Sequence, residues 1–260
     1  MDQFTSIIPL ARWPEEFTFG PFLDTLRRRM PEADIGHAGR PTELHTRAIT
    51  LSVDGVEMLV GMTAEPLDPE LVERAVSLAH TWPGAGEAVH GCPAHAVVGV
   101  HEEPKGWARS REVARLVETV AHALIGHVPA RAHLWGTAAR LLPVETFSSI
   151  IDDPRSTALR WVGLEFFRGP RTVDGEETVA IHTRGLAGFI GYEMELAAVP
   201  MSPPNAAQII MSVAQYLLDN GPVLDNGDII GPPDGARFQV HRLSRERSHG
   251  AVKMQLSLVG

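Results

Sequence analysis

Three Asp-Gly or Asn-Gly pairs constrain the fold of this 260-residue chain more than any other feature of its sequence. They are Asp54-Gly55, Asp174-Gly175 and Asn226-Gly227, and predicted strands flank each of them. Both residues of such a pair tolerate the positive φ angles of a type I′ turn, which joins two antiparallel strands directly. The sequence therefore predicts β-hairpins, and hence antiparallel-rich sheets, in both halves of the chain.

Strands and helices alternate through the first hundred residues in the predicted order β-α-β-β-α-β. Apolar residues at helical spacing mark the first helix, which contains Phe22, Leu26 and Met30. Asp68 is the expected N-cap of the second helix, because Pro69 suits the first helical position. The predicted strands are residues 4–10, 47–53, 56–62 and 94–100. This order is that of ferredoxin-like folds.

The second half of the chain is predicted to repeat this order after an intervening helix, Arg109–Ile125. A further strong helix begins at Pro203, follows the N-cap Ser202 and ends at Gly221. The other predicted elements are strands at 132–135, 158–167, 178–183, 192–199, 238–240 and 252–259, a strand opening at Val223, and a helix at 144–151.

These elements predict an α+β fold of two packed lobes, each an antiparallel-rich sheet with helices on one face. A ferredoxin-like duplication is one form that this architecture can take. We expect an N-terminal lobe at residues 1–105, a connecting helix at 106–128 and a C-terminal lobe at 129–260.

The net charge and the cysteine content indicate which partners and which cellular compartment to expect. A net charge of -9, with histidines neutral, repels polyanions, so nucleic-acid binding is not expected. Cys92 is the single cysteine, which rules out an intrachain disulfide and suits a reducing compartment. The sequence lacks a membrane-length apolar run and begins with an acid at Asp2, unlike a secretory signal. We therefore expect a cytoplasmic protein that does not bind membranes.

The stretch from Ile181 to Gly231 is the most distinctive part of the sequence. It contains Thr183-Arg184-Gly185-Leu186, then Gly191-Tyr192-Glu193-Met194-Glu195, and then the long motif Tyr216–Gly231. In these motifs the chain resembles the bacterial family known as domain of unknown function 4261, whose members carry a Glu-x-Glu strand and a similar Asn-Gly-containing segment. In the first half, Met62, Trp82-Pro83 and Ala94-His95 are similar to that family too. The resemblance implies a fold and a bacterial origin, and it implies no activity.

Carboxylates supply the one plausible chemical site. Glu193 and Glu195 stand two apart on a predicted strand, so both side chains are expected on one face. Together with Asp228, and with His182 nearby, they could hold a divalent cation or act as general acid and base. The structural alternative is that Glu193 and Glu195 line a solvent-facing strand edge and discourage edge pairing, and we favour it.

Other motifs predict structure rather than chemistry. His80, His90, Cys92, His95 and His101 cluster in sequence, but their spacing does not match paired zinc ligands, so neither a metal nor a cofactor is predicted. Cys92 lacks the orienting third group of a nucleophile and is expected in a loop before a buried strand.

Two further features are interpreted in the same way. Gly221 and Gly227 are expected as a helix C-cap and a turn residue, because their spacing fits no phosphate-binding loop. Glu118 and His122, four residues apart, are expected to form a surface pair on the helix at 109–125.

The functional hypothesis that we favour is a non-catalytic interaction protein with a basic protein partner, because the sequence shows no complete catalytic or metal constellation. An immunity or accessory protein that binds a toxin or secreted effector is one concrete form. Trp13 and Trp107, in loop-like sequence, are partner-contact candidates, as are Glu193 and Glu195. The alternative is a small-molecule or divalent-metal-dependent enzyme that uses Glu193, Glu195 and Asp228.

Overall fold

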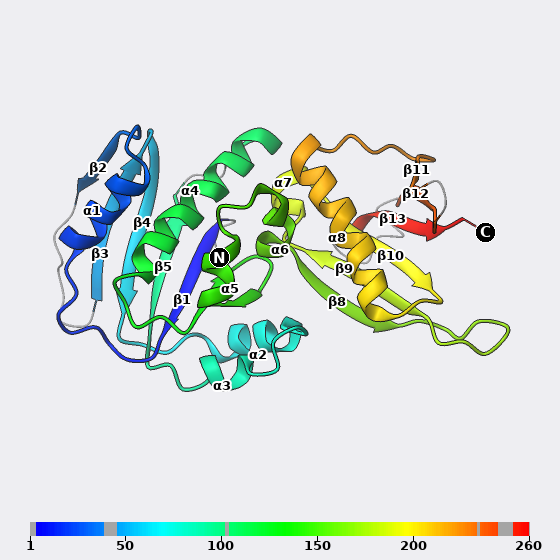
Figure 1. Ribbon diagram of the computed structural model, residues 1–260, viewed down its shortest axis with the longest axis horizontal. Coiled ribbons are helices and arrows are strands. Elements are labelled where there is room, and N and C mark those ends of the chain that lie inside the picture. The colour runs from blue at the N-terminus through cyan, green and yellow to red at the C-terminus, as the bar shows by residue number, and fades with distance from the viewer. Residues whose placement is uncertain (1–3, 39–45, 102–103, 233–234, 244–251, 260) are drawn as a thin grey trace. The chain divides into compact units, whose positions relative to one another are not determined.

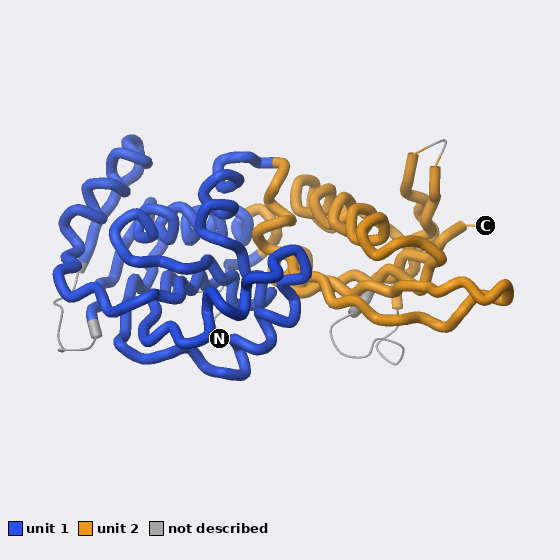
Figure 2. The backbone as a smooth tube through the Cα atoms, turned by 60° about the horizontal axis from the view of Figure 1, so that its bottom comes forward, with its two compact units in different colours: residues 1–105, 109–154 blue, residues 106–108, 155–260 orange. Residues whose placement is uncertain are grey.

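The computed structural model describes residues 4–38, 46–101, 104–232, 235–243 and 252–259. The chain forms two compact units, in which unit 1 comprises residues 1–105 and 109–154 and unit 2 comprises residues 106–108 and 155–260 (Figure 2). This division differs from the expected lobes, because residues 129–154 pack with unit 1. Strand β6 (Ala132–Trp135) pairs with the first strand of the chain, β1 (Thr5–Leu10), and draws this segment into unit 1.

Unit 1 contains a seven-stranded sheet in the order β2-β3-β4-β5-β1-β6-β7, and every pairing in it is antiparallel. The hairpin of β3 and β4 turns at Asp54 and Gly55, whose φ angles of 49° and 75° are those that the Asp-Gly pair predicted. The strands not yet bounded are β2 (Ile35–Ala38), β3 (Thr46–Val53), β4 (Val56–Thr63), β5 (Ala94–Val100) and β7 (Arg140–Pro143).

Helices cover the unit 1 sheet from both sides (Figure 1). α1 (Phe19–Arg29), α4 (Trp107–Ile125) and α5 (Val144–Ile150) bury their apolar stripes, and the His133 ring of β6 stacks on Phe147 of α5. α2 (Pro69–Leu78) and α3 (Ala85–Val89) pack on the other face in a cluster with Ile7, Leu134 and Leu141. This coverage explains why β1 is buried along its whole length.

Unit 2 contains a six-stranded sheet in the order β11-β12-β13-β10-β9-β8. All its pairings are antiparallel except that of β10 with β13. The strands are β8 (Gly163–Arg168), β9 (Val179–Arg184), β10 (Glu193–Val199), β11 (Ile229–Ile230), β12 (Phe238–Arg242) and β13 (Val252–Leu258).

One long helix, α8 (Pro203–Asn220), covers one face of this sheet and contacts β9 and β10 (Figure 1). Ile181, Leu196, Leu256 and Val240 are cross-strand neighbours in one row of the sheet, and each is 0% exposed. The short helices of unit 2 are η1 (Pro154–Ser156), whose first residue belongs to unit 1, α6 (Thr157–Trp161) and α7 (Ala187–Ile190).

The mixed α+β class agrees with the sequence, but three details differ. A ferredoxin-like duplication is not confirmed, because β4 and β5, the strands before and after α2, pair directly and antiparallel, whereas the two strands of a split βαβ unit are parallel with another strand between them. The strand predicted at 158–167 begins only at Gly163, since Thr157–Trp161 is helical. Val223 opens no strand, and the chain reaches β11 only at Ile229.

Candidate functional site

One row of the unit 2 sheet consists of five polar residues that are direct cross-strand neighbours: Glu165, His182, Glu195, Gln255 and His241. His182 Nε2 lies 3.4 Å from Glu195 Oε2, and Gln255 Nε2 donates to Glu195 Oε1 at 2.9 Å. The structure thus brings Glu195 and His182 together, as the chemical hypothesis required. Both side chains have structural partners across the strands, as on an ordinary polar sheet face.

Glu193 has a different role from Glu195. It is 8% exposed, and Thr183 Oγ1 donates to its Oε2 at 2.7 Å. The backbone N–H groups of Gly185, Leu186 and Ala187 donate to the same carboxylate at 2.7, 3.2 and 3.1 Å. Four donors occupy about as many lone-pair sites as a carboxylate offers, so Glu193 holds the turn between β9 and α7.

Asp228 closes the turn of the Asp225-Asn226-Gly227-Asp228 segment. The Asp225 N–H donates to Asp228 Oδ2 at 2.7 Å, and the Asp228 N–H donates to the Asp225 carbonyl at 3.1 Å. Arg242 pairs with Asp225 at 2.7 Å and fixes this turn on β12. The glycine-rich stretch is therefore a structural turn.

The three carboxylates do not form one site. Strands β12 and β13 lie between β10 and β11, and three strand spacings amount to about 14 Å. Asp228, next to β11, is therefore far from Glu193 and Glu195 on β10. Over the part of the chain that the structure describes, no group of three or more His, Cys, Asp or Glu side chains could hold a metal ion.

An open groove of about 880 Å³ runs along α8 in unit 2. We call it the α8 groove. Residues of α8 and Met201 just before it line one side, and the segment after the helix lines the other. The lining residues are Met201, Asn205, Gln208, Ile209, Ser212, Val213 and Tyr216 on the first side, and Leu224, Asp228, Ile229, Ile230, Gly231, Pro232, Ala236 and Phe238 on the second.

The groove gathers the C-terminal motif of the sequence into one surface. Tyr216, Leu224 and Ile229 all belong to the segment Tyr216–Gly231, and the structure places them around a single concavity. Tyr216 and Ile229 are each 48% exposed at its rim. Sequence reasoning missed this site, because local spacing does not show whether an apolar flank of a helix is covered by the rest of the chain. The signal was available in Ile209, Val213 and Tyr216, which continue a second apolar flank at helical spacing.

Burial shifts the pKa of two residues of the sequence motifs. Desolvation raises the pKa of Tyr192, where Arg242 acts in the opposite direction and Asp225 in the same direction. Burial likewise raises the pKa of the Cys92 thiol, which Arg131 partly offsets. Cys92 Sγ donates to the Ala88 carbonyl at 3.4 Å. A thiol with a raised pKa is a poor nucleophile, so the geometry favours a structural Cys92.

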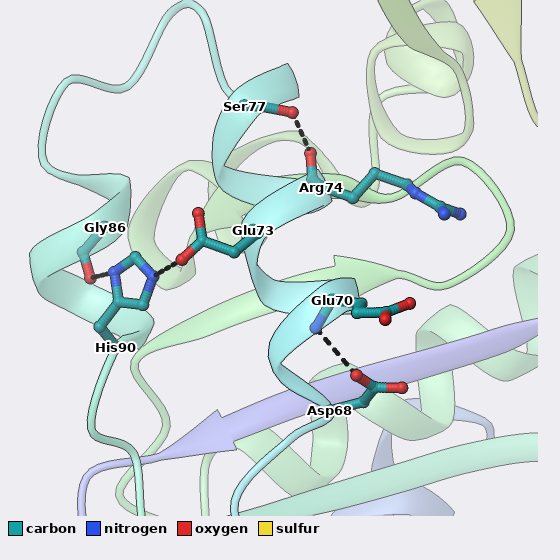
Figure 3. Close-up of polar contacts among 7 residues, drawn as sticks. All are labelled: Asp68, Glu70, Glu73, Arg74, Ser77, Gly86 and His90. Carbon is teal, nitrogen blue, oxygen red and sulfur yellow. Dashed lines mark hydrogen bonds and ion pairs between the residues drawn. The ribbon is translucent and has the colours of Figure 1, made fainter.

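The histidine cluster near Cys92 is spread over separate local contacts. His90 Nδ1 lies 2.9 Å from the Gly86 carbonyl, and its Nε2 lies 3.0 Å from Glu73 Oε1 of α2 (Figure 3). His95 Nδ1 instead lies 2.8 Å from the Glu65 carbonyl. His90 thus joins α3 to α2. The same close-up shows Asp68 at the start of α2, where its carboxylate accepts a hydrogen bond from the Glu70 N–H.

The two tryptophan candidates have internal contacts. Trp107 is the first residue of α4 rather than part of a loop, and its Nε1 donates to the Leu218 carbonyl at 2.9 Å. Its ring also packs on Gly221. Trp13 lies in a loop as expected, with the Arg47 guanidinium 5.1 Å from its ring centroid. Both rings are half-buried. Because Trp107 also donates a hydrogen bond and packs on Gly221, Trp13 is the more available of the two for a partner.

Within the described residues, no helix has the length and apolar character needed to cross a membrane.

Comparison with known proteins identifies a family for part of the chain. Residues 182–253 match the model of the family described as domain of unknown function 4261, which confirms the resemblance over that segment. No curated protein and no solved structure matches the chain.

Proposed function

We propose, starting from the family match of residues 182–253, that this chain is a non-catalytic interaction protein whose α8 groove binds a protein partner. The observation that carries the proposal is the α8 groove itself, which exposes Tyr216 and Ile229 beside aliphatic lining residues. Protein partners that lay an apolar face into a groove use concave surfaces with aliphatic and aromatic lining residues of this kind.

The charge of the molecule supports a basic partner. The chain carries a net charge of -9. Among the described residues that line the groove, Asp228 is the only one with a charged side chain. Complementary charge raises the association rate and excludes acidic competitors. An immunity or accessory protein that neutralises a basic toxin or effector is the concrete form that we favour, in a cytoplasmic setting.

The enzyme alternative has weaker support. It needs Glu193, Glu195 and Asp228 to converge, yet Glu193 is occupied by four hydrogen bonds and Asp228 lies beyond two intervening strands.

The test begins with affinity co-purification from the encoding organism, and then measures the affinity of the purified partner. Ser212→Trp places an indole in the groove, whereas Met211→Trp places one on a half-buried residue of α8 that does not line it. We expect Ser212→Trp to weaken binding at least about tenfold, or ~1.4 kcal/mol, and Met211→Trp to have little effect. Equal affinity of all three proteins, or recovery of a bare chain carrying a metal ion or small molecule, would overturn the proposal.

A further inference from the structure

We infer that the occupant of the α8 groove is an amphipathic helix of the partner, with basic residues at the end that lies beside the C-terminus of α8. This inference rests on the proposed function and specifies the chemistry of the bound segment.

The dimensions of the sheet leave room for a second helix beside α8. Six strands span roughly 24 Å between the outermost axes at ~4.8 Å per step. One α-helix is about 10–12 Å across with its side chains. α8 contacts β9 and β10, so the part of the same face over β12 and β11 is where the groove lies (Figure 1). Phe238 of β12 lines the groove there.

The wall formed by α8 has the periodicity that helix packing uses. Its lining residues recur three or four positions apart, as in Asn205, Gln208, Ser212 and Tyr216. Rows at this spacing form the ridges and grooves into which a neighbouring helix packs. From Asn205 to Tyr216 the helical wall is about 17 Å long at 1.5 Å per residue, which matches a bound helix of roughly 12 residues.

The open rim favours a macromolecular segment over a small molecule. Pockets for small ligands bury about 70–90% of the ligand surface. Here Tyr216 and Ile229 on opposite sides are each 48% exposed, so a ligand between them keeps much of its own surface in water. A helix lays one apolar stripe into such a groove and leaves its polar face in solvent.

A helix also fits better than an added strand. Strand addition draws its affinity from a row of backbone groups on a sheet edge. The edge strand next to the groove, β11, is only two residues long, Ile229–Ile230. A helix satisfies its own backbone hydrogen bonds and requires only side-chain contacts, which the groove offers.

The acidic residues at the groove predict which charged residues the bound helix carries. No lysine or arginine is found among the described residues that line the groove, whereas Asp228 lines it and Asp219 lies three positions after Tyr216 on α8. Asp219 lies in the last turn of α8, where the helix dipole also favours cations, and Asp228 belongs to the segment that lines the opposite side of the groove. Lysine or arginine on the bound helix therefore belongs at this end.

The test is a selection of random 16-residue peptides displayed on phage against the full wild-type chain, followed by affinity measurements of the enriched peptides on wild type and on the Ser212→Trp variant. We expect enriched peptides to carry apolar residues at i, i+3 or i+4 and i+7, to be net basic, and to bind Ser212→Trp at least about tenfold more weakly. Asp219→Lys should weaken their binding about threefold, while Met211→Trp, on the flank of α8 that does not line the groove, should not.

The outcomes separate this inference from the proposed function. Enriched peptides with apolar residues at alternate positions overturn the inference that the bound segment is a helix. Enriched peptides with net negative charge overturn the inference that it is basic. In both cases the binding of a partner in the groove stands. Peptides that bind wild type and Ser212→Trp equally, or no enrichment at all, overturn the helix. If the natural partner also binds both proteins equally, the proposed function fails with it.

Discussion

At the scale of single residues, hydrogen-bond partners separate side chains that the sequence places together. Glu193 and Glu195 are two positions apart on β10, yet Glu193 holds the turn at 183–187 and Glu195 contacts His182 and Gln255. A Glu-x-Glu motif thus carries two structural roles, and mutation should affect the stability of the fold more at the buried position.

We expect Glu193→Ala to lower the free energy of unfolding by about 3 kcal/mol, because it leaves buried N–H groups of the turn without an acceptor. Glu195→Ala, on the more exposed polar row, should lower it by less than about 1 kcal/mol. Urea denaturation followed by circular dichroism measures both values. A catalytic Glu193 would behave differently, with a fold as stable as wild type.

His122 illustrates a second environment that sequence spacing misjudged. The expected surface pair with Glu118 is wrong, because Glu118 is 1% exposed. His122 is half-buried and packs edge-on against Phe147 at 5.9 Å. Burial lowers the pKa of His122 below its usual 6.5, and Arg29 adds to this, while Asp152 opposes it.

This shift makes stability depend on pH in a defined direction. Because the pKa of His122 is lower in the folded chain, the unfolded chain takes up the proton first as pH falls below about 6.5. The contribution is therefore fully present above that pH and is lost as pH falls towards the folded-state pKa. We expect wild type to lose more stability than His122→Gln between pH 7.5 and pH 5, measured by urea denaturation. A parallel decline of both proteins would contradict this account.

At the scale of elements, the end of α8 is determined by one glycine and one aromatic ring. Gly221 has φ 86° and ψ −173°, a conformation that is essentially restricted to glycine. A Cβ built there would lie 3.3 Å from Cδ2 of Trp107. The sequence predicted the glycine C-cap, but it did not predict that Trp107 covers it.

Gly221→Ala should lower the free energy of unfolding by about 1–3 kcal/mol through backbone strain, with a further loss from displacement of the Trp107 ring. Gly227→Ala is the matched control, because Gly227 also has a positive φ of 96° but its Cβ would meet nothing within 4 Å. The difference between the two variants in thermal unfolding measures the Trp107 contact, and equal values would show that this contact contributes nothing.

At the scale of the whole molecule, the position of the unit boundary follows from strand pairing. Leu134 and Leu141 of β6 and β7 are 1% and 2% exposed and belong to the core that α2 and α3 share with Ile7 of β1. A chain ending before β6 therefore exposes the side of β1 and lacks the part of that core that β6 and β7 supply.

We expect a fragment of residues 1–154 to unfold cooperatively on heating and a fragment of residues 1–128 to lose cooperativity or to aggregate. The physical reason is the loss of β6, β7 and α5, which bury Trp135 and Phe147 at 0% exposure. Circular dichroism and scanning calorimetry of the two fragments provide the comparison. Cooperative unfolding of the shorter fragment would instead support the boundary expected from the sequence.

Local signals in the sequence determined much of the element content. Turn chemistry at Asp54-Gly55, the cap at Asp68 and the proline start of α8 at Pro203 each depend on residues within a few positions, so they could be predicted without tertiary contacts. The C-terminal motif also pointed to the family whose model matches residues 182–253.

Tertiary structure alone decided which elements pair and what each polar side chain contacts. Direct pairing of β1 with β5 and β6 joins residues more than eighty positions apart, and no local pattern encodes it. The α8 groove likewise exists only because lining residues at 224–232 and 236–238 return beside α8. Periodicity specifies that a flank of a helix is apolar, whereas the packing of the remaining chain decides whether that flank is covered.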